Sequence, residues 1–379
     1  MPNVMSYAQR RNEMKHYKKI LVSGCALSIA WTPIYAQETD AEEDIGENQI
    51  SFLIDAPIRA STIVVTASGS ANNIDNNGLA ISVIDQDEIE KIQSQDIITL
   101  LERVPGVTST RNGSLGGFTG VRIRGSEAEQ VLVLLDGARV NDPSSPGGGF
   151  DFGNLLTGGL TNIEVLRGSN SIIWGSQAIG GVINVTTSSS VNGGSLSAEY
   201  GRDDTFNVNG SINQDIGPLD IGLSAGYLNS DGFSSFDGGE EDDGFEQYYI
   251  NGRANLEITD NLTAKIRGRF ADGRLEIDGF PAPDFIFNDT NELQDTQEIS
   301  AYAGLEYRAD KFTLSAAYSL LDNNRDNFDP TNEFSFDFFS RGRTERVELR
   351  TNIDLTDAIT LDFGAENEES GFTLSLIHI

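Results

Sequence analysis

From Gly193 onward, apolar and polar residues alternate along the chain with a period of two. In "LTAKIRGRF", for example, every second residue from Leu262 to Ile266 is apolar. Alternation of this kind predicts β-strands with one apolar face and one polar face. The predicted strands are nine in number and lie near 195–200, 205–216, 219–230, 246–259, 262–274, 295–309, 311–323, 342–356 and 359–369.

The length and spacing of these strands distinguish between two kinds of β-protein. Strands of a soluble sandwich typically have about five or six residues, whereas most of these have 11 to 15, which suits a tilted strand that crosses a membrane. Arg, Lys, Asp and Glu on the polar faces suit a water-filled lumen. Short turns such as "TDN" alternate with long loops such as "SDGFSSFDGGEEDDGF". The combination favours a transmembrane β-barrel over a sandwich.

The preceding segment, 74–190, predicts a compact α+β domain. "GLAISVID" and "QVLVLLDGARV" are predicted strands, and "QDEIEKIQSQDIITLLERVPGV" has apolar residues at helical spacing. Long Gly/Ser/Asn loops separate these elements, and long loops in compact domains tend to be functional. We therefore expect contacts to a large hydrogen-bonding ligand in these loops, with plain solvation as the alternative. The expected contact residues are Asn112, Ser114, Leu115, Asn141, Ser144 and Ser145.

The Gly-rich segment "RGSNSIIWGSQAIGGVINVTT" (167–187) joins two apolar runs and has to be tested as a phosphate-binding loop. Its glycines fit neither the P-loop nor the dinucleotide spacing, and no Lys follows Gly181. The β-branched run that follows predicts a strand, whereas a phosphate loop opens a helix. We therefore expect these glycines to serve turns and close backbone approach.

Composition excludes several function classes. The net charge of −32 argues against a nucleic-acid partner, because phosphate contacts need clustered Lys and Arg. The chain has one Cys and two His: Cys25 and His16 lie in the N-terminal leader, and His378 lies in the C-terminal stretch "LSLIHI", which does not follow the pattern of the preceding region. We therefore expect that no thiol or Ser–His–Asp site can be assembled. We therefore expect no enzyme activity. A secreted hydrolase that uses two carboxylates is the alternative.

The N-terminal residues predict export from the cytoplasm. "MKHYKK" is basic, "ILVSGCALSIAW" is apolar but too short to span a membrane as a helix, and "IYA" offers a cleavage point. Residues 1–36 are therefore a predicted signal peptide, in which 1–13 would be upstream read-through. Residues 37–73 predict a flexible tether with one β-prone stretch, "STIVVTA" at 61–67. A lone strand of this kind is a candidate for adding to the sheet edge of a partner.

Four ordered motifs resemble those of TonB-dependent outer-membrane receptors, and the likeness is nearest to the vitamin B12 transporter branch. The motifs are "LLERVPGV", "VRIRG", "VLVLLDGARV" and "IEVLRGSNSIIWGSQAIGGVINVTT". Ser169 and Trp174 depart from the Pro and Tyr that are usual in the family. The resemblance implies that residues 74–190 form the plug domain and that 191–379 form the first part of a barrel of about 22 strands. Since nine strands cannot close an even-numbered barrel, the barrel is expected to be truncated.

The resemblance also implies a function and partners. The function is active import of a large scarce nutrient, cobalamin or a siderophore-type iron complex, across the bacterial outer membrane. A passive porin, or a glycan-uptake receptor of the same fold, is the alternative. The expected partners are a TonB-type energy transducer, outer-membrane lipid and the nutrient, with the protein as a monomer. The TonB box that would add to the transducer's sheet consists of Ser61, Thr62, Ile63, Val64, Val65, Thr66 and Ala67.

Two further sets of residues follow from the resemblance. Arg122, Arg124 and Arg167 would be plug charges that meet lumen carboxylates such as Glu257, with plain solvation as the alternative.

The second set lies in the outer loop "FDGGEEDDGFEQ", which resembles the calcium-binding loop of B12 transporters. Ca²⁺ suits it, because Ca²⁺ takes about six to eight oxygen ligands, although the spacing is not that of an EF-hand. The expected ligands are Asp237, Glu241 and Asp243, completed by Asp284 and Asp289. A solvated acidic loop is the alternative, and no other cofactor is expected.

Overall fold

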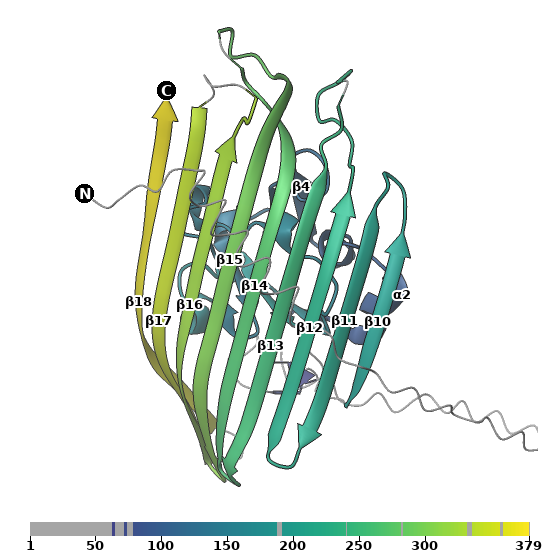
Figure 1. The fold of residues 1–379 in the computed structure, drawn as a ribbon. Helices are drawn as coiled ribbons and strands as arrows, with labels where there is room; N and C mark the ends of the chain where they lie inside the picture. The colour runs from purple at the N-terminus through teal and green to yellow at the C-terminus, as the bar shows by residue number, and fades with distance from the viewer. Residues whose placement is uncertain are drawn as a thin grey trace, which may run out of the picture. The chain divides into compact units, whose positions relative to one another are not determined.

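The computed structural model describes residues 63–64, 72–73, 79–187, 192–239, 241–281, 283–331, 336–356 and 359–378. All of them lie in the second of two compact units, Arg59–Ile379. Within this unit an α+β domain is followed along the chain by one long antiparallel sheet (Figure 1). In the part of the chain that is described, no helix is long and apolar enough to cross a membrane. The predicted signal peptide lies outside the described residues.

The α+β domain is built on a five-stranded sheet with the strand order β3, β8, β9, β6, β7. These strands are β3 (Ile81–Asp85), β6 (Val131–Leu135), β7 (Ala138–Arg139), β8 (Asn162–Arg167) and β9 (Gly181–Thr186). Every residue of β6 is buried, because β6 runs parallel to β9 inside the sheet and both of its faces are covered. A separate antiparallel pair consists of β4 (Val107–Arg111) and β5 (Thr119–Ile123).

Short helices and turns connect the strands of this domain. They are α2 (Gln86–Ile92), α3 (Ile98–Leu101) and α4 (Ser171–Trp174), with 3₁₀ turns at Ala128–Gln130, Pro146–Gly148 and Phe152–Asn154. Helix α2 begins where the Asp85 side chain accepts a hydrogen bond from Glu88 N at 2.9 Å, and it ends at Gln93 in the left-handed conformation. Ile89 and Leu100 are buried, as their helical spacing predicts.

The nine predicted strands of the second part are present and form one sheet in chain order. They are β10 (Gly193–Tyr200), β11 (Phe206–Ile216), β12 (Leu219–Ser230), β13 (Phe245–Thr259), β14 (Leu262–Gly279), β15 (Asn288–Ala309), β16 (Phe312–Phe328), β17 (Phe336–Thr356) and β18 (Ile359–His378). Ile250 and Ile266 are exposed on one face, whereas Asn251, Arg269 and Arg346 are buried on the other. An apolar outer face with a polar inner face is the pattern of a membrane barrel, so the predicted fold class is confirmed.

The strands are longer at their loop ends than the alternation predicts. Strand β16 continues to Phe328, five residues past the predicted end at 323, and β14 continues to Gly279 rather than 274. The extension of β16 is "NRDNF", in which both faces are largely polar. A strand segment that rises beyond the lipid needs no apolar face, so the period-two signal is lost there.

The α+β domain packs against the polar face of the nine-stranded sheet. Leu156 of the domain shares an apolar cluster with Leu228, Phe245 and Tyr249 of the sheet, and Leu115 packs against this cluster. Farther back along the chain, β1 (Ile63–Val64) pairs antiparallel with β2 (Asn72–Asn73). The other residues of the predicted TonB box lie outside the described residues; they are Ser61, Thr62, Val65, Thr66 and Ala67.

Candidate functional site

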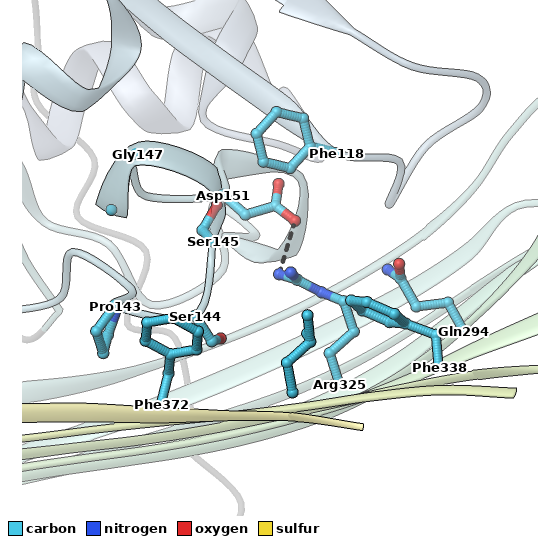
Figure 2. A pocket seen from close by; sticks show the side chains of 12 residues that line it. Phe118, Pro143, Ser144, Ser145, Gly147, Asp151, Gln294, Arg325, Phe338 and Phe372 are labelled. Atoms are coloured by element: carbon cyan, nitrogen blue, oxygen red, sulfur yellow. Dashed lines mark ion pairs between the residues drawn. The ribbon is translucent and has the colours of Figure 1, made fainter. Parts of the chain in front are cut away.

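A cleft of about 790 Å³ lies between the α+β domain and the sheet. Its walls come from the loop 141–151, from Phe118 and from strands β15 to β18, and Figure 2 shows the side chains around it. Three phenylalanines and one guanidinium dominate the lining. The lining residues are Phe118, Pro143, Ser144, Ser145, Gly147, Gly148, Asp151, Gln294, Arg325, Phe338, Phe372 and Leu374.

Asp142 fixes the loop 141–151 onto the sheet. Its Oδ1 accepts hydrogen bonds from Ser144 N and Ser144 Oγ at 2.8 and 2.7 Å, and its Oδ2 accepts one from Asn323 Nδ2 of β16 at 2.9 Å. On β17, a Cβ at Gly342 would lie 2.5 Å from Asp142 Oδ1, so this close approach requires glycine. The loop is therefore seated on β16 and β17.

Arg325 of β16 lies between two carboxylates of the α+β domain. Its Nη2 is 3.6 Å from Asp151 Oδ2 and 3.9 Å from Asp142 Oδ2, and Figure 2 marks the first of these ion pairs. Asp151 Oδ1 also accepts hydrogen bonds from Thr119 N at 2.9 Å and Gly153 N at 3.0 Å. Burial raises the pKa of Asp151, and the charge of Arg325 opposes that shift.

A second group of charges joins the domain to the sheet at β17 and β18. Arg139 Nη2 donates to the carbonyl of Trp174 at 2.6 Å and lies 3.6 Å from Glu366 Oε2. Arg346 pairs with the same Glu366, and the guanidinium of Arg350 stacks 4.2 Å from the centre of the Trp174 ring. Trp174, which departs from the usual Tyr, is thus a packing partner of the sheet.

The plug-to-wall role predicted for three arginines is not what the described residues show. Arg122 donates to Thr110 Oγ1 and pairs with Glu127, both within the α+β domain. Arg167 Nη1 donates to the carbonyl of Pro105. Arg124 sits at a turn with a φ of 54°, where its main-chain N–H donates to the carbonyl of Gly106 at 2.7 Å.

The physical reason for this correction is local geometry. The turn that carries Arg124 and the β4–β5 pairing that carries Arg122 keep both side chains next to their own domain. The ion pairs that connect the domain to the sheet join other residues. Arg139 pairs with Glu366, and Asp142 and Asp151 both pair with Arg325.

The six predicted ligand-contact residues separate into two groups. Ser144 and Ser145 line the cleft. The Asn141 side chain is used inside the domain, because it accepts from Val133 N at 2.9 Å and donates to Val131 O at 3.1 Å. Ser114 is buried and Leu115 packs into the apolar cluster of the sheet, while Asn112 is exposed beside them.

Sequence reasoning missed the cleft residues that come from the sheet. Arg325 and Phe338 lie between the predicted strands 311–323 and 342–356, because the strands that carry them extend beyond the alternating pattern. A lone Arg within the Asn/Asp-rich run "LDNNRDNFD" was the one signal available for Arg325. Buried Arg is rare without a partner, but burial could not be read from the sequence.

The acidic outer loop forms a compact cluster with a residue of the next strand. One carboxylate oxygen each from Glu241, Asp243 and Asp278 lies within 4.8 Å of the others, and we call this set the acidic cluster. Of the other predicted ligands, Asp237 and Asp284 are exposed outside it, and Asp289 interacts with Glu241. Asp278 was not predicted, because it lies 35 positions beyond Asp243 and only the pairing of β13 with β14 brings it near.

The electrostatics of the acidic cluster are unfavourable as the cluster stands. Burial raises the pKa of Glu241 to about 7, and the neighbouring Asp243 and Asp289 add to the shift. Burial also raises the pKa of Asp243. Glu241 Oε1 and Asp243 Oδ1 are buried and have no hydrogen-bond partner among the described residues. Oxygens in this situation suit a cation.

The comparisons with known proteins agree with the domain order. Residues 73–182 match the family model described as TonB-dependent Receptor Plug Domain. The structure is similar to that of the ferric yersiniabactin uptake receptor FyuA from Yersinia pestis, with a TM-score of 0.63 and 17% identity over 80% of this chain and 50% of that one. It is also similar to the alcaligin outer membrane receptor FauA from Bordetella pertussis, with a TM-score of 0.66 and 16% identity over 87% of this chain and 54% of that one.

A third similar structure is BauA, the ferric preacinetobactin receptor from Acinetobacter baumannii, with a TM-score of 0.63 and 15% identity over 83% of this chain and 50% of that one. The chain therefore spans about half the length of these receptors. Residues 73–182 thus match the plug domain of TonB-dependent receptors, and the long antiparallel strands that follow are folded as in these outer-membrane receptors.

Proposed function

We propose that the protein imports a ferric siderophore-type complex across the outer membrane with energy from a TonB-type transducer. The observation that carries the proposal is the cleft of about 790 Å³ between plug loops and the sheet. Its size suits a large ligand, since small-molecule sites typically have about 300–1,000 Å³. Similar structures include receptors whose names specify ferric yersiniabactin and ferric preacinetobactin. Three phenylalanines and Arg325 suit an aromatic, oxygen-rich complex better than a neutral glycan.

The plug argues against a passive porin. The domain packs against the polar face of the sheet. It is held there by ion pairs with Arg325 and Glu366 and by the apolar cluster around Phe245. Passage of a ligand therefore requires the plug to move, and those contacts must break. We propose that the transducer supplies the force by adding a strand to the TonB box at 61–67. Import of this kind makes and breaks no covalent bond, so no enzymatic activity is proposed.

We also propose that the acidic cluster binds Ca²⁺. Support comes from three converging carboxylates and from two buried oxygens without a hydrogen-bond partner, Glu241 Oε1 and Asp243 Oδ1. Hard oxygen donors on a flexible loop suit Ca²⁺. Calorimetry should detect Ca²⁺ binding at millimolar concentration or below, with Asp243→Asn abolishing it. Asp237→Asn, which removes an exposed charge of the same loop, is the matched control and should leave the affinity unchanged.

Uptake of radioactive iron into cells tests the import function. Cells that lack their own siderophore receptors should gain uptake of a ferric siderophore when they express the protein, and lose it again when the transducer is deleted. Binding of the ferric complex to the purified protein should persist without the transducer. Uptake that is independent of the transducer would point to a porin, and binding of cobalamin alone would point to the vitamin B12 branch.

A further inference from the structure

A buried guanidinium in the wall of the cleft has hydrogen-bond donors without acceptors. The Arg325 side chain is 11% exposed. Its Nε and Nη2 atoms are buried and have no hydrogen-bond partner among the described residues. Nη2 stays 3.6 and 3.9 Å from the two nearest carboxylate oxygens, so its attraction to Asp151 and Asp142 is one of charge. Buried donors without an acceptor are rare in folded proteins, and each one calls for an explanation.

The two carboxylates that face Arg325 are in the opposite situation. Asp142 accepts from Ser144 N, Ser144 Oγ and Asn323 Nδ2. Asp151 accepts from two main-chain N–H groups and from Asn154 Nδ2 at 3.3 Å. Their hydrogen bonds are therefore supplied without Arg325. A shift of the guanidinium toward the cleft would weaken two ion pairs but would leave neither carboxylate without donors.

We propose that Arg325 binds an oxyanionic group of the imported complex, a carboxylate or catecholate oxygen pair, and that this contact draws the guanidinium away from Asp142 and Asp151 of the plug. The inference rests on the import function proposed above and specifies the charge class of the ligand. A guanidinium can give two parallel hydrogen bonds to paired oxygens. Phe118, Phe338 and Phe372 line the same cleft and offer aromatic surface to the remainder of the ligand.

Arg325 would then couple ligand binding in the cleft to the attachment of the plug. The loop 141–151 is seated on the sheet through Asp142, which Arg325 and Asn323 both approach. When a ligand binds the guanidinium of Arg325, the ion pair between Arg325 and Asp142 is lost. Only the hydrogen bond from Asn323 then holds the loop at this carboxylate. Because the coupling is reciprocal, a loop that is less firmly attached also leaves Arg325 more available to the ligand.

Two ferric complexes of similar size serve as probes, an anionic tris-catecholate and a neutral tris-hydroxamate. Their affinities are measured for the unchanged protein, for Arg325→Gln and for Arg343→Gln, all purified from outer membranes. Arg343 on β17 is 58% exposed, so its loss removes the same charge away from the cleft. Arg325→Gln should weaken tris-catecholate binding at least about tenfold and tris-hydroxamate binding less than about twofold, and Arg343→Gln should alter neither.

Hydrogen exchange provides the second readout. The tris-catecholate should accelerate exchange in the loop 141–151 of the unchanged protein and should not do so in Arg325→Gln. If Arg325→Gln does not fold, Arg325→Lys takes its place, because it keeps the charge but loses Nε and the planar pair of donors. Its catecholate affinity should fall about threefold or more.

The outcomes separate this inference from the import function. Equal catecholate affinity in the unchanged protein and in the folded Arg325 variant would overturn the role of Arg325 and leave import standing. Tight binding of the tris-hydroxamate alone would overturn the anionic class. Failure of the unchanged protein to bind either complex would count against ferric siderophore import itself.

Discussion

The hydroxyl of Ser114 donates a hydrogen bond of 2.8 Å to the main-chain carbonyl of Asp243, which lies 129 positions further along the chain. The two residues are 2% and 1% exposed. The Asp243 carboxylate serves other partners: its Oδ2 accepts from Ser235 N at 2.6 Å, and the side chain belongs to the acidic cluster. A single residue of the outer loop therefore links the acidic cluster to the plug loop 112–118.

Ser114→Ala removes the donor and leaves the Asp243 carbonyl buried without it. We expect the attachment of the loop 112–118 to weaken by about 1–3 kcal/mol, the usual cost of an unsatisfied buried group. Hydrogen exchange of residues 112–118 should quicken accordingly. Ser109→Ala is the control, since that hydroxyl bonds Glu102 at the exposed surface, and it should leave exchange unchanged. Equal protection in both variants would show that the Ser114 contact does not hold the loop.

Gly116→Ala tests the same attachment by steric means. Gly116 has a φ of +87°, and a Cβ there would lie 2.2 Å from the Phe245 ring. Gly125 has a φ of +76° with nothing within 4 Å of its added Cβ, so Gly125→Ala isolates the backbone strain. That strain should cost about 1–2 kcal/mol. Chemical denaturation should show a larger loss for Gly116→Ala, because Phe245 must also move. Equal losses would mean that the plug and sheet are not closely packed there.

Much of the fold could be predicted from the sequence, because the signals involved are local. The alternation in "LTAKIRGRF" and the turn "TDN" fix strands and connections without distant contacts. Where both faces of a strand become polar, as around Arg325, the signal ends although the strand does not. The cleft was missed for that reason, since its sheet side is built from those polar extensions.

Side-chain roles in the loops were harder to predict, because they depend on partners that are distant in sequence. Asn141 has the character of a ligand contact, yet its amide satisfies the main chain of β6 at Val131 and Val133. Glu241 and Asp243 could be singled out from their own acidic run. Their partner Asp278 could not, because its position follows from the register in which Phe245 faces Leu275.

Glu241 should make the outer loop sensitive to pH when Ca²⁺ is chelated. Because its pKa rises from 4.5 to about 7, the folded loop binds this proton more tightly than the unfolded chain does. Between about pH 4.5 and 7 the folded state therefore holds more protons, and its stability falls as the pH rises through that window. Exchange protection of residues 231–244, corrected for intrinsic rates, should be greater at pH 5 than at pH 8.

Glu241→Gln should remove most of that difference, whereas Asp242→Asn at the exposed neighbouring position should keep it. Millimolar Ca²⁺ should restore protection at pH 8, because the cation replaces the proton and binds better when the carboxylates are ionised. A loop with the same protection at both pH values would contradict the buried environment of Glu241.

Ile63→Pro should separate ligand binding from energy-dependent transport. Ile63 lies in β1 and pairs with Asn73, far along the chain from the residues that line the cleft. Proline removes the main-chain N–H at this position, so the predicted TonB box at 61–67 loses a donor that sheet pairing with a transducer would use. Affinity for a ferric complex should stay within about twofold of the unchanged protein, while cellular uptake of radioactive iron should fall to the level seen without the transducer. Ile63→Val, which keeps the N–H and the β-branched shape, should transport normally. Normal uptake by Ile63→Pro would show that this strand is not where the transducer attaches, because no strand added at Ile63 could keep its full set of main-chain hydrogen bonds.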